Sequence, residues 1–158
     1  MNAQIHAQLE SAGELHARSM ELADRALVLR LEGSGSESRR SLEQAFELER
    51  DAADLLSATD VPALSRSVYH RSAASLAIQV RDWDEARRLV EQGLWGIPPQ
   101  EIAVELEELK QLIEVERRAT TPFAKPVQLR SYETERAVTY VKAFVTEATD
   151  SYRRATPA

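Results

Sequence analysis

The sequence predicts an all-α fold, and three observations lead to this prediction. Apolar residues recur at spacings of three and four through most of the 158 residues, which is the period of an amphipathic helix. Only five glycines and six prolines are present, and most lie between the periodic segments, where they mark turns. Hydrophobic residues make up 43% of the chain and charged residues 29%, as in a folded protein rather than a disordered one. We therefore expect about six helices, paired as antiparallel hairpins.

Two helices are predicted before the centre of the chain. An apolar stripe over residues 3–32 predicts the first, with Gly13 as a candidate break. Glycines and serines directly after it predict a flexible loop. A second stripe over residues 38–57 predicts the next helix. Ser38 or Ser41 can cap its N-terminus, because a serine hydroxyl accepts hydrogen bonds from the free N–H groups of a first turn.

The chain is organised around a central pair of short helices. The first is predicted over residues 63–80, and Arg81 and Asp82 form the turn after it. Asp82 is the expected N-cap of the second helix, and Glu85 follows three residues later, as in a capping box. The second helix must end before Pro98, because proline cannot continue a helix.

The central segment resembles a tetratricopeptide (TPR) repeat. The family pattern has a small residue midway in the first helix, an aromatic residue after the turn, an alanine three residues later and a closing proline. Ala74, Trp83, Ala86 and Pro98 stand at these positions with the family's spacings. His70 departs from the pattern, since the family often has an aromatic residue there.

This resemblance implies a role in binding other proteins. In TPR hairpins the first helix lines the groove that holds a peptide, so the resemblance places Arg71, Ser75, Ile78 and Gln79 at the contact with a partner. Residues 66–113 are also similar to small uncharacterised bacterial TPR-like proteins, and this similarity implies no activity.

The resemblance further implies a short array of stacked TPR-like hairpins with a capping helix. Residues 26–56 look like a degenerate copy of the repeat, with Ala45 where the central copy has Ala86. Residues 99–118 predict a helix that covers the exposed apolar edge, as terminal helices of repeat proteins do. Its apolar positions are Ile102, Leu106, Leu109, Leu112 and Ile113, and Glu105, Glu107 and Glu108 are expected to face outward.

The end of the chain is predicted to form a separate element. The prolines of residues 119–126 indicate an extended linker after a helical domain at residues 1–118. A narrow apolar stripe between Ser131 and Arg153 predicts an extra C-terminal helix within residues 127–158. We expect this helix to pack on the domain or on a second subunit, which would give a homodimer.

Charge and composition argue against several classes of function. The net charge of −6 is uneven: residues 1–60 carry −6 (12 acidic, 6 basic), residues 61–118 carry −2 (10 and 8) and residues 119–158 carry +2 (4 and 6). An acidic body does not favour nucleic acid as a partner. The absence of cysteine excludes disulfides and thiolate metal ligands. No stretch approaches the ~18 apolar residues of a membrane helix, and the polar N-terminus does not resemble a signal peptide, so we expect a cytoplasmic protein.

No group of residues predicts catalysis, a cofactor or a metal site. The three histidines, His6, His16 and His70, fit no metal-ligand spacing, and the motifs of phosphate-binding loops and nucleophile elbows are not found in the sequence. His6 and Glu10 lie one helical turn apart and are expected to form a surface pair. Arginine doublets at residues 39–40, 87–88, 117–118 and 153–154 could form a phosphate-binding stripe. Acidic residues at helical spacing from them favour an ion-paired surface instead.

Together these observations predict a non-catalytic adaptor or scaffold that binds a peptide or a helix of another protein. The alternative is a nucleic-acid-associated or antitoxin-like regulatory protein. A contiguous arginine face would favour the alternative, whereas a groove of mixed character would favour the adaptor.

Overall fold

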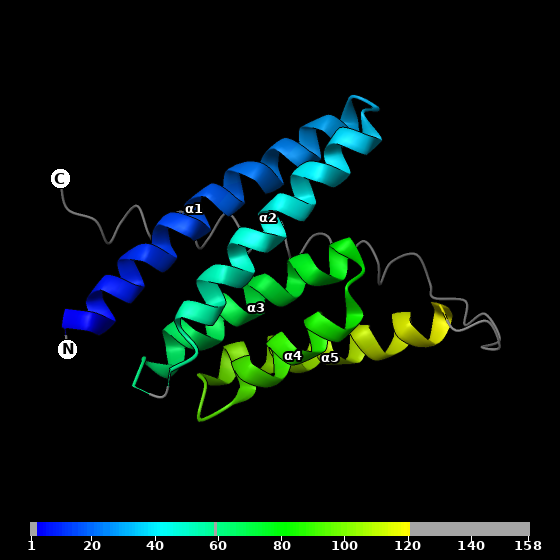
Figure 1. Ribbon diagram of the computed structural model, residues 1–158. Helices are drawn as coiled ribbons and strands as arrows, with labels where there is room; N and C mark the ends of the chain where they lie inside the picture. Colours follow the sequence, from blue (N-terminus) through cyan, green and yellow to red (C-terminus); the bar gives the residue numbers. More distant parts are fainter. Residues whose placement is uncertain (1–2, 59, 121–158) are drawn as a thin grey trace. The chain divides into compact units, whose positions relative to one another are not determined.

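The computed structural model describes residues 3–58 and 60–120, which form five α-helices and contain no β-strand (Figure 1). The all-α prediction is therefore confirmed for this part of the chain. The chain divides into two units, Met1–Arg118 and Ala119–Ala158. The predicted linker begins inside the last described helix, which extends to Thr120. The predicted C-terminal helix lies outside the described residues.

Helices α1 (Ala3–Leu31) and α2 (Gly35–Leu55) run antiparallel as one long hairpin (Figure 1). The turn between them passes through Gly33, whose φ of +83° favours glycine. Gly13 is buried within α1, which continues through it, so the predicted break at this residue is wrong.

The start of α2 also differs from the prediction. Ser34 is the N-cap residue, and its side chain makes no capping hydrogen bond. Ser38 and Ser41 lie inside the helix, so the prediction that one of them caps it is wrong. Buried serines instead donate to main-chain carbonyls across the hairpin: Ser19 to Ala45 (2.8 Å), Ser38 to Ala26 (2.6 Å) and Ser41 to Leu22 (2.8 Å). These small side chains let the two helices approach closely while their hydroxyl groups remain hydrogen-bonded.

Helices α3 (Ala63–Val80) and α4 (Trp83–Leu94) have the predicted bounds at the central turn. Arg81 ends α3 in the left-handed conformation, with φ of 65°, and its N–H donates to the carbonyl of Ile78. The predicted N-cap is confirmed, because the Asp82 carboxylate accepts from the backbone N–H of Glu85 at 3.1 Å.

The main hydrophobic core lies where α2, α3 and α4 meet, and it continues onto the last helix. Ala74 and Ala86 are fully buried in it, and Trp83 packs against it. Gly93 is needed at this place because an added Cβ would lie 3.0 Å from the Leu106 side chain and 3.2 Å from the His70 Cβ. A second cluster joins α1 and α2 to the segment before α3: Ala12, Ala52, Leu56 and Val61.

Helix α5 (Gln100–Thr120) completes the described unit. Leu106 and Ile113 are buried and belong to the main core, as predicted, whereas the other predicted apolar positions are half-buried. Ion pairs tie the helix to α3 and α4: Glu105 to Arg71, Glu114 to Arg87 (2.6 Å) and Arg117 to Asp84 (3.2 Å). Glu105 thus faces α3, so its predicted outward orientation is wrong.

Candidate functional site

The four residues predicted to contact a partner lie on α3, and they differ in exposure. The Arg71 side chain is buried and forms an ion pair with Glu105 of α5. Burial lowers the pKa of Arg71, while the charge and hydrogen bond of Glu105 act in the opposite direction. Ser75 is half-buried and donates to the Arg71 carbonyl, Ile78 packs partly against the core, and Gln79 is exposed. Contact between Arg71 and a bound peptide would therefore require this ion pair to open first.

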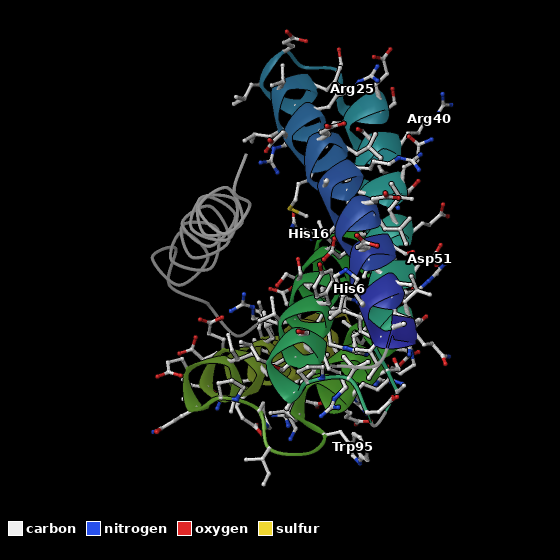
Figure 2. All side chains as sticks on the ribbon, turned by 90° about the vertical axis from the view of Figure 1, so that its left-hand side faces the viewer. His6, His16, Arg25, Arg40, Asp51 and Trp95 are labelled. Carbon is white, nitrogen blue, oxygen red and sulfur yellow. The ribbon has the colours of Figure 1, made fainter. Side chains whose placement is uncertain are left out.

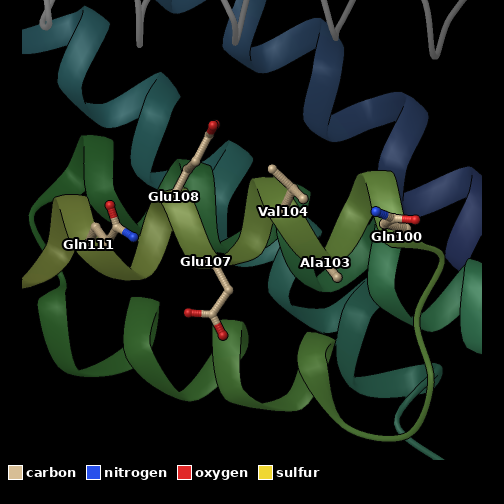
Figure 3. Close-up of a pocket in the computed structure, with 6 residues that line it drawn as sticks. All are labelled: Gln100, Ala103, Val104, Glu107, Glu108 and Gln111. Atoms are coloured by element: carbon tan, nitrogen blue, oxygen red, sulfur yellow. The ribbon is translucent and has the colours of Figure 1, made fainter.

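A shallow depression of about 310 Å³ lies on α5 (Figure 3). Its described lining residues all come from this one helix: Gln100, Ala103, Val104, Glu107, Glu108 and Gln111. Val104 and Glu108 point to one side of the helix and Glu107 to the other. The lining combines small apolar contacts with carboxylates and amides, and it holds neither an imidazole nor a hydroxyl nucleophile.

A buried acid–base pair joins α1 to α2. Glu49 is fully buried, and both of its carboxylate oxygens lie 2.9 Å from Nδ1 of His16. The ring of Tyr69 meets the His16 ring edge-on, with 5.5 Å between centroids. Burial lowers the pKa of His16, but the hydrogen bond and negative charge of Glu49 outweigh it, so the pKa is raised. Because the carboxylate is closed to solvent, the pair serves as a structural ion pair.

His70 is a second buried histidine, with the opposite electrostatic behaviour. Its Nδ1 donates to the Arg66 carbonyl at 2.8 Å, and its Nε2 lies 3.3 Å from the Ser57 hydroxyl and 3.1 Å from Oε1 of Gln92. Burial lowers the pKa of His70 more than the hydrogen bonds to Arg66 and Gln92 and the charge of Asp54 raise it. The buried ring packs between α3 and α4 with both of its nitrogens in hydrogen-bond contact.

A buried arginine lies where the start of α3 meets the α4–α5 loop. Arg66 is only 4% exposed. Its Nη2 donates to the Trp95 carbonyl at 2.8 Å and its Nη1 to the Val61 carbonyl at 3.4 Å, whereas its buried Nε has no hydrogen-bond partner among the described residues. The guanidinium also stands over the Trp95 ring, 4.9 Å from the ring centroid. Gly96, with φ of +83°, passes so close that an added Cβ would lie 2.7 Å from Nη2.

Three large apolar side chains on the α4–α5 loop and at the start of α3 are exposed, and one of them, Trp95, covers the Arg66 guanidinium. Trp95, on the loop at the lower end of the view in Figure 2, is 53% exposed. Ile97 of the same loop is 91% exposed, and Leu64 in the first turn of α3 is 55% exposed. We call Leu64, Trp95 and Ile97 the apolar end surface. The geometry joins a desolvated cation to exposed apolar groups, which is a combination suited to binding.

The arginine doublets do not form a free cationic stripe over the described helices. Each of the three described doublets has an arginine paired with a carboxylate: Arg39 with Glu43 (2.9 Å), Arg87 with Glu114 (2.6 Å), Arg88 with Asp54 (3.1 Å) and Glu85 (2.5 Å), and Arg117 with Asp84 (3.2 Å). The fourth doublet lies outside the described residues. The expected pair of His6 and Glu10 is present at 3.8 Å.

The described residues contain no group of three or more metal-ligating side chains close enough to hold an ion. None of their helices combines the length and the apolar character that crossing a bilayer requires. A scan against protein-family models, a search of curated proteins and a search of solved structures each found no match.

Sequence reasoning missed Arg66 and its surroundings, although the sequence carries one signal for them. Trp95 and Ile97 are large apolar residues on either side of Gly96, in a segment that ends at two prolines, where no helical stripe can bury them. Exposed apolar groups in a loop indicate contact with another molecule. The burial of Arg66 has no local signal, because it depends on how the α4–α5 loop folds back onto α3.

Proposed function

We propose that the chain is a non-catalytic protein-interaction module that binds its partner at the apolar end surface. One observation supports the proposal above the others: Trp95 and Ile97 stand exposed on the short loop between α4 and α5, and Leu64 in the first turn of α3 is exposed as well. Tryptophan is enriched among the residues that dominate binding energy, and clustered exposed apolar groups mark interaction sites on monomeric proteins.

The loop that presents these residues is held in place from inside the unit. Arg66 binds the Trp95 carbonyl, and Gly96 fits against the same guanidinium. A loop fixed in this way loses little conformational entropy when a partner binds, and this raises affinity without new contacts.

We also propose that α3 and α4 form a TPR-like unit. Ala74 and Ala86 are fully buried, and Trp83 packs against the same core, which are the roles that the TPR resemblance implies for these residues. Pro98 lies in the loop that follows α4. On this reading α5 is the capping helix of a short array.

The alternative role, a nucleic-acid-associated or antitoxin-like regulator, has less support. It needs a contiguous set of arginines free to contact phosphates. The pairing of arginines with carboxylates in the three described doublets reduces the positive charge available for such contacts.

Site-specific photo-crosslinking in the native cell tests the proposed surface. A photoreactive amino acid is placed at Ile97, at Gln79 on the α3 face that the TPR resemblance implies, and at Glu37, an exposed residue near the distant α1–α2 turn. We expect a discrete protein crosslink from position 97 and none from position 37. The crosslink should be lost when Trp95→Ser is added.

The other outcomes also decide the question. A crosslink from position 79 alone would place the partner on the α3 face and overturn the proposed surface. Crosslinks to nucleic acid would favour the regulator. Failure of position 97 to crosslink to any protein would likewise refute the proposal.

A further inference from the structure

The cation buried beneath the apolar end surface has no counter-charge in the described structure. Among the described residues, Arg66 donates only to two neutral main-chain carbonyls, and its Nε has no hydrogen-bond partner. Arg71, five residues further along α3, is buried to a similar degree, but it faces the carboxylate of Glu105. Buried charges in proteins are normally paired, since desolvation is costly for an isolated ion.

The start of α3 adds to the positive potential at the same place. No side chain caps the N-terminus of this 18-residue helix, and its first turn contains no acidic residue. Unsatisfied N–H groups and the helix dipole favour a negative group there. The Arg66 side chain extends toward this end, since its Nη1 reaches the carbonyl of Val61. Two independent features therefore favour a negative group at this place: a buried guanidinium without a charged partner among the described residues, and a helix start without a side-chain cap.

We propose that Arg66 receives an acidic side chain of the partner protein, flanked by apolar residues on both sides. This inference rests on the proposed function and specifies the chemistry of the partner. The carboxylate would pair with the guanidinium after the Trp95 ring, which now covers it, turns aside. Leu64 in the first turn of α3 and Ile97 on the loop are both exposed, and we infer that they would contact the two flanking residues. An internal segment supplies two apolar flanks, whereas a chain terminus supplies only one.

Nuclear magnetic resonance of the full chain tests this assignment. The protein has two tryptophans, so the Trp95 indole N–H signal is identified from a Trp95→Phe sample. The probe is the blocked peptide acetyl-Ala-Leu-Glu-Leu-Ala-amide. We expect it to shift the Trp95 indole and the Arg66 Nε–H signals in a saturable way. The same peptide with glutamine in place of glutamate should bind at least about tenfold more weakly, because it lacks the charge that pairs with the guanidinium.

Protein variants provide the matched controls. Arg66→Leu should abolish the carboxylate-dependent binding, and Arg66→Lys should weaken it at least about tenfold, since lysine lacks the planar fork of donors. Arg39→Leu removes an exposed arginine of α2, paired with Glu43, and should leave binding unchanged. A circular dichroism spectrum of each variant establishes that it is folded.

Three results would overturn the inference. Equal binding of the glutamate and glutamine peptides would mean that Arg66 is only a structural tether for the loop, while the apolar end surface could still bind a partner. If acetyl-Ala-Leu-Gln-Leu with a free C-terminus binds and the peptide with the internal glutamate does not, Arg66 receives a C-terminal carboxylate and not an acidic side chain. If no peptide binds, Arg66 does not receive an acidic side chain. The crosslinking experiment would still test the proposed function separately.

Discussion

The two hairpins of the described unit are held together in different ways. Polar groups inside the α1–α2 interface, namely serine hydroxyls bound to main-chain carbonyls and the His16–Glu49 pair, join its helices. Apolar side chains predominate in the α3–α4 interface, where Ala74, Ala86 and Leu89 are fully buried and His70 contacts Gln92. Hydrogen-bonded buried polar groups are more numerous in the first hairpin, and close apolar packing predominates in the second.

This difference predicts two kinds of fragility. A buried polar group costs little while its partner is present and much once the partner is removed. A closely packed crossing tolerates neither added volume nor added charge. Substitutions chosen from each hairpin should therefore separate the two mechanisms, and their expected effects differ in size.

The largest effect is expected at the α3–α4 crossing. Ala86→Arg would place a long cationic side chain at a position with no exposed surface. Overpacking and an unpaired charge together should lower the free energy of unfolding by about 4 kcal/mol or more. Urea denaturation measures this loss. Gln79→Arg, at an exposed position of α3, is the control and should change stability by less than about 0.5 kcal/mol. An unchanged midpoint for Ala86→Arg would contradict the packing described for this hairpin.

A smaller loss is expected when the polar pair of the first hairpin is broken. His16→Leu leaves the Glu49 carboxylate buried without its partner. The free energy of unfolding should fall by about 2–3 kcal/mol, near the lower end for a broken buried pair because His16 is partly exposed. The double variant His16→Leu with Glu49→Leu should recover much of this loss, since it leaves no unpaired charge. A double variant as unstable as His16→Leu alone would show that packing, not charge, governs this site.

The two buried histidines should make the hairpins respond oppositely to pH. The folded pKa of His16 is raised above 6.5, so its pair stabilises the protein fully below pH 6.5 and loses this contribution as pH rises through the folded pKa. The folded pKa of His70 is lowered, so its contribution is present above pH 6.5 and is lost as pH falls toward the folded pKa.

Unfolding free energies measured from about pH 5 to about pH 9 separate these contributions. His16→Gln should remove the decline on the alkaline side, and His70→Gln should reduce the decline on the acidic side. The same slope in His16→Gln as in the parent protein above pH 6.5 would mean that Glu49 does not raise the pKa of His16.

The sequence predicted the second hairpin better than the first, for a physical reason. The bounds of α3 and α4 and the Asp82 cap follow from local signals: a turn, a capping residue and a change of periodicity. Serine is also a typical N-cap residue, but the hydroxyl groups of Ser38 and Ser41 donate instead to main-chain carbonyls of α1. Arg66 escaped prediction in the same way, since its burial depends on a loop that begins 29 residues later. Caps and turns can be predicted from neighbouring residues, whereas the partner of a polar side chain on another helix cannot.

The smallest expected effects compare the two helix starts directly. Asp82 caps α4 with its side chain, so Asp82→Ala should cost about 1 kcal/mol. Ser34 occupies the same position before α2 but makes no side-chain cap, so Ser34→Ala should cost no more than about 0.3 kcal/mol. Ser38→Ala removes the hydrogen bond to Ala26, worth about 1 kcal/mol, but gains about 0.5 kcal/mol of helix propensity. A loss at Ser34 as large as that at Asp82 would mean that the Ser34 hydroxyl caps α2 in solution. Both α2 and α4 would then begin with a side-chain cap.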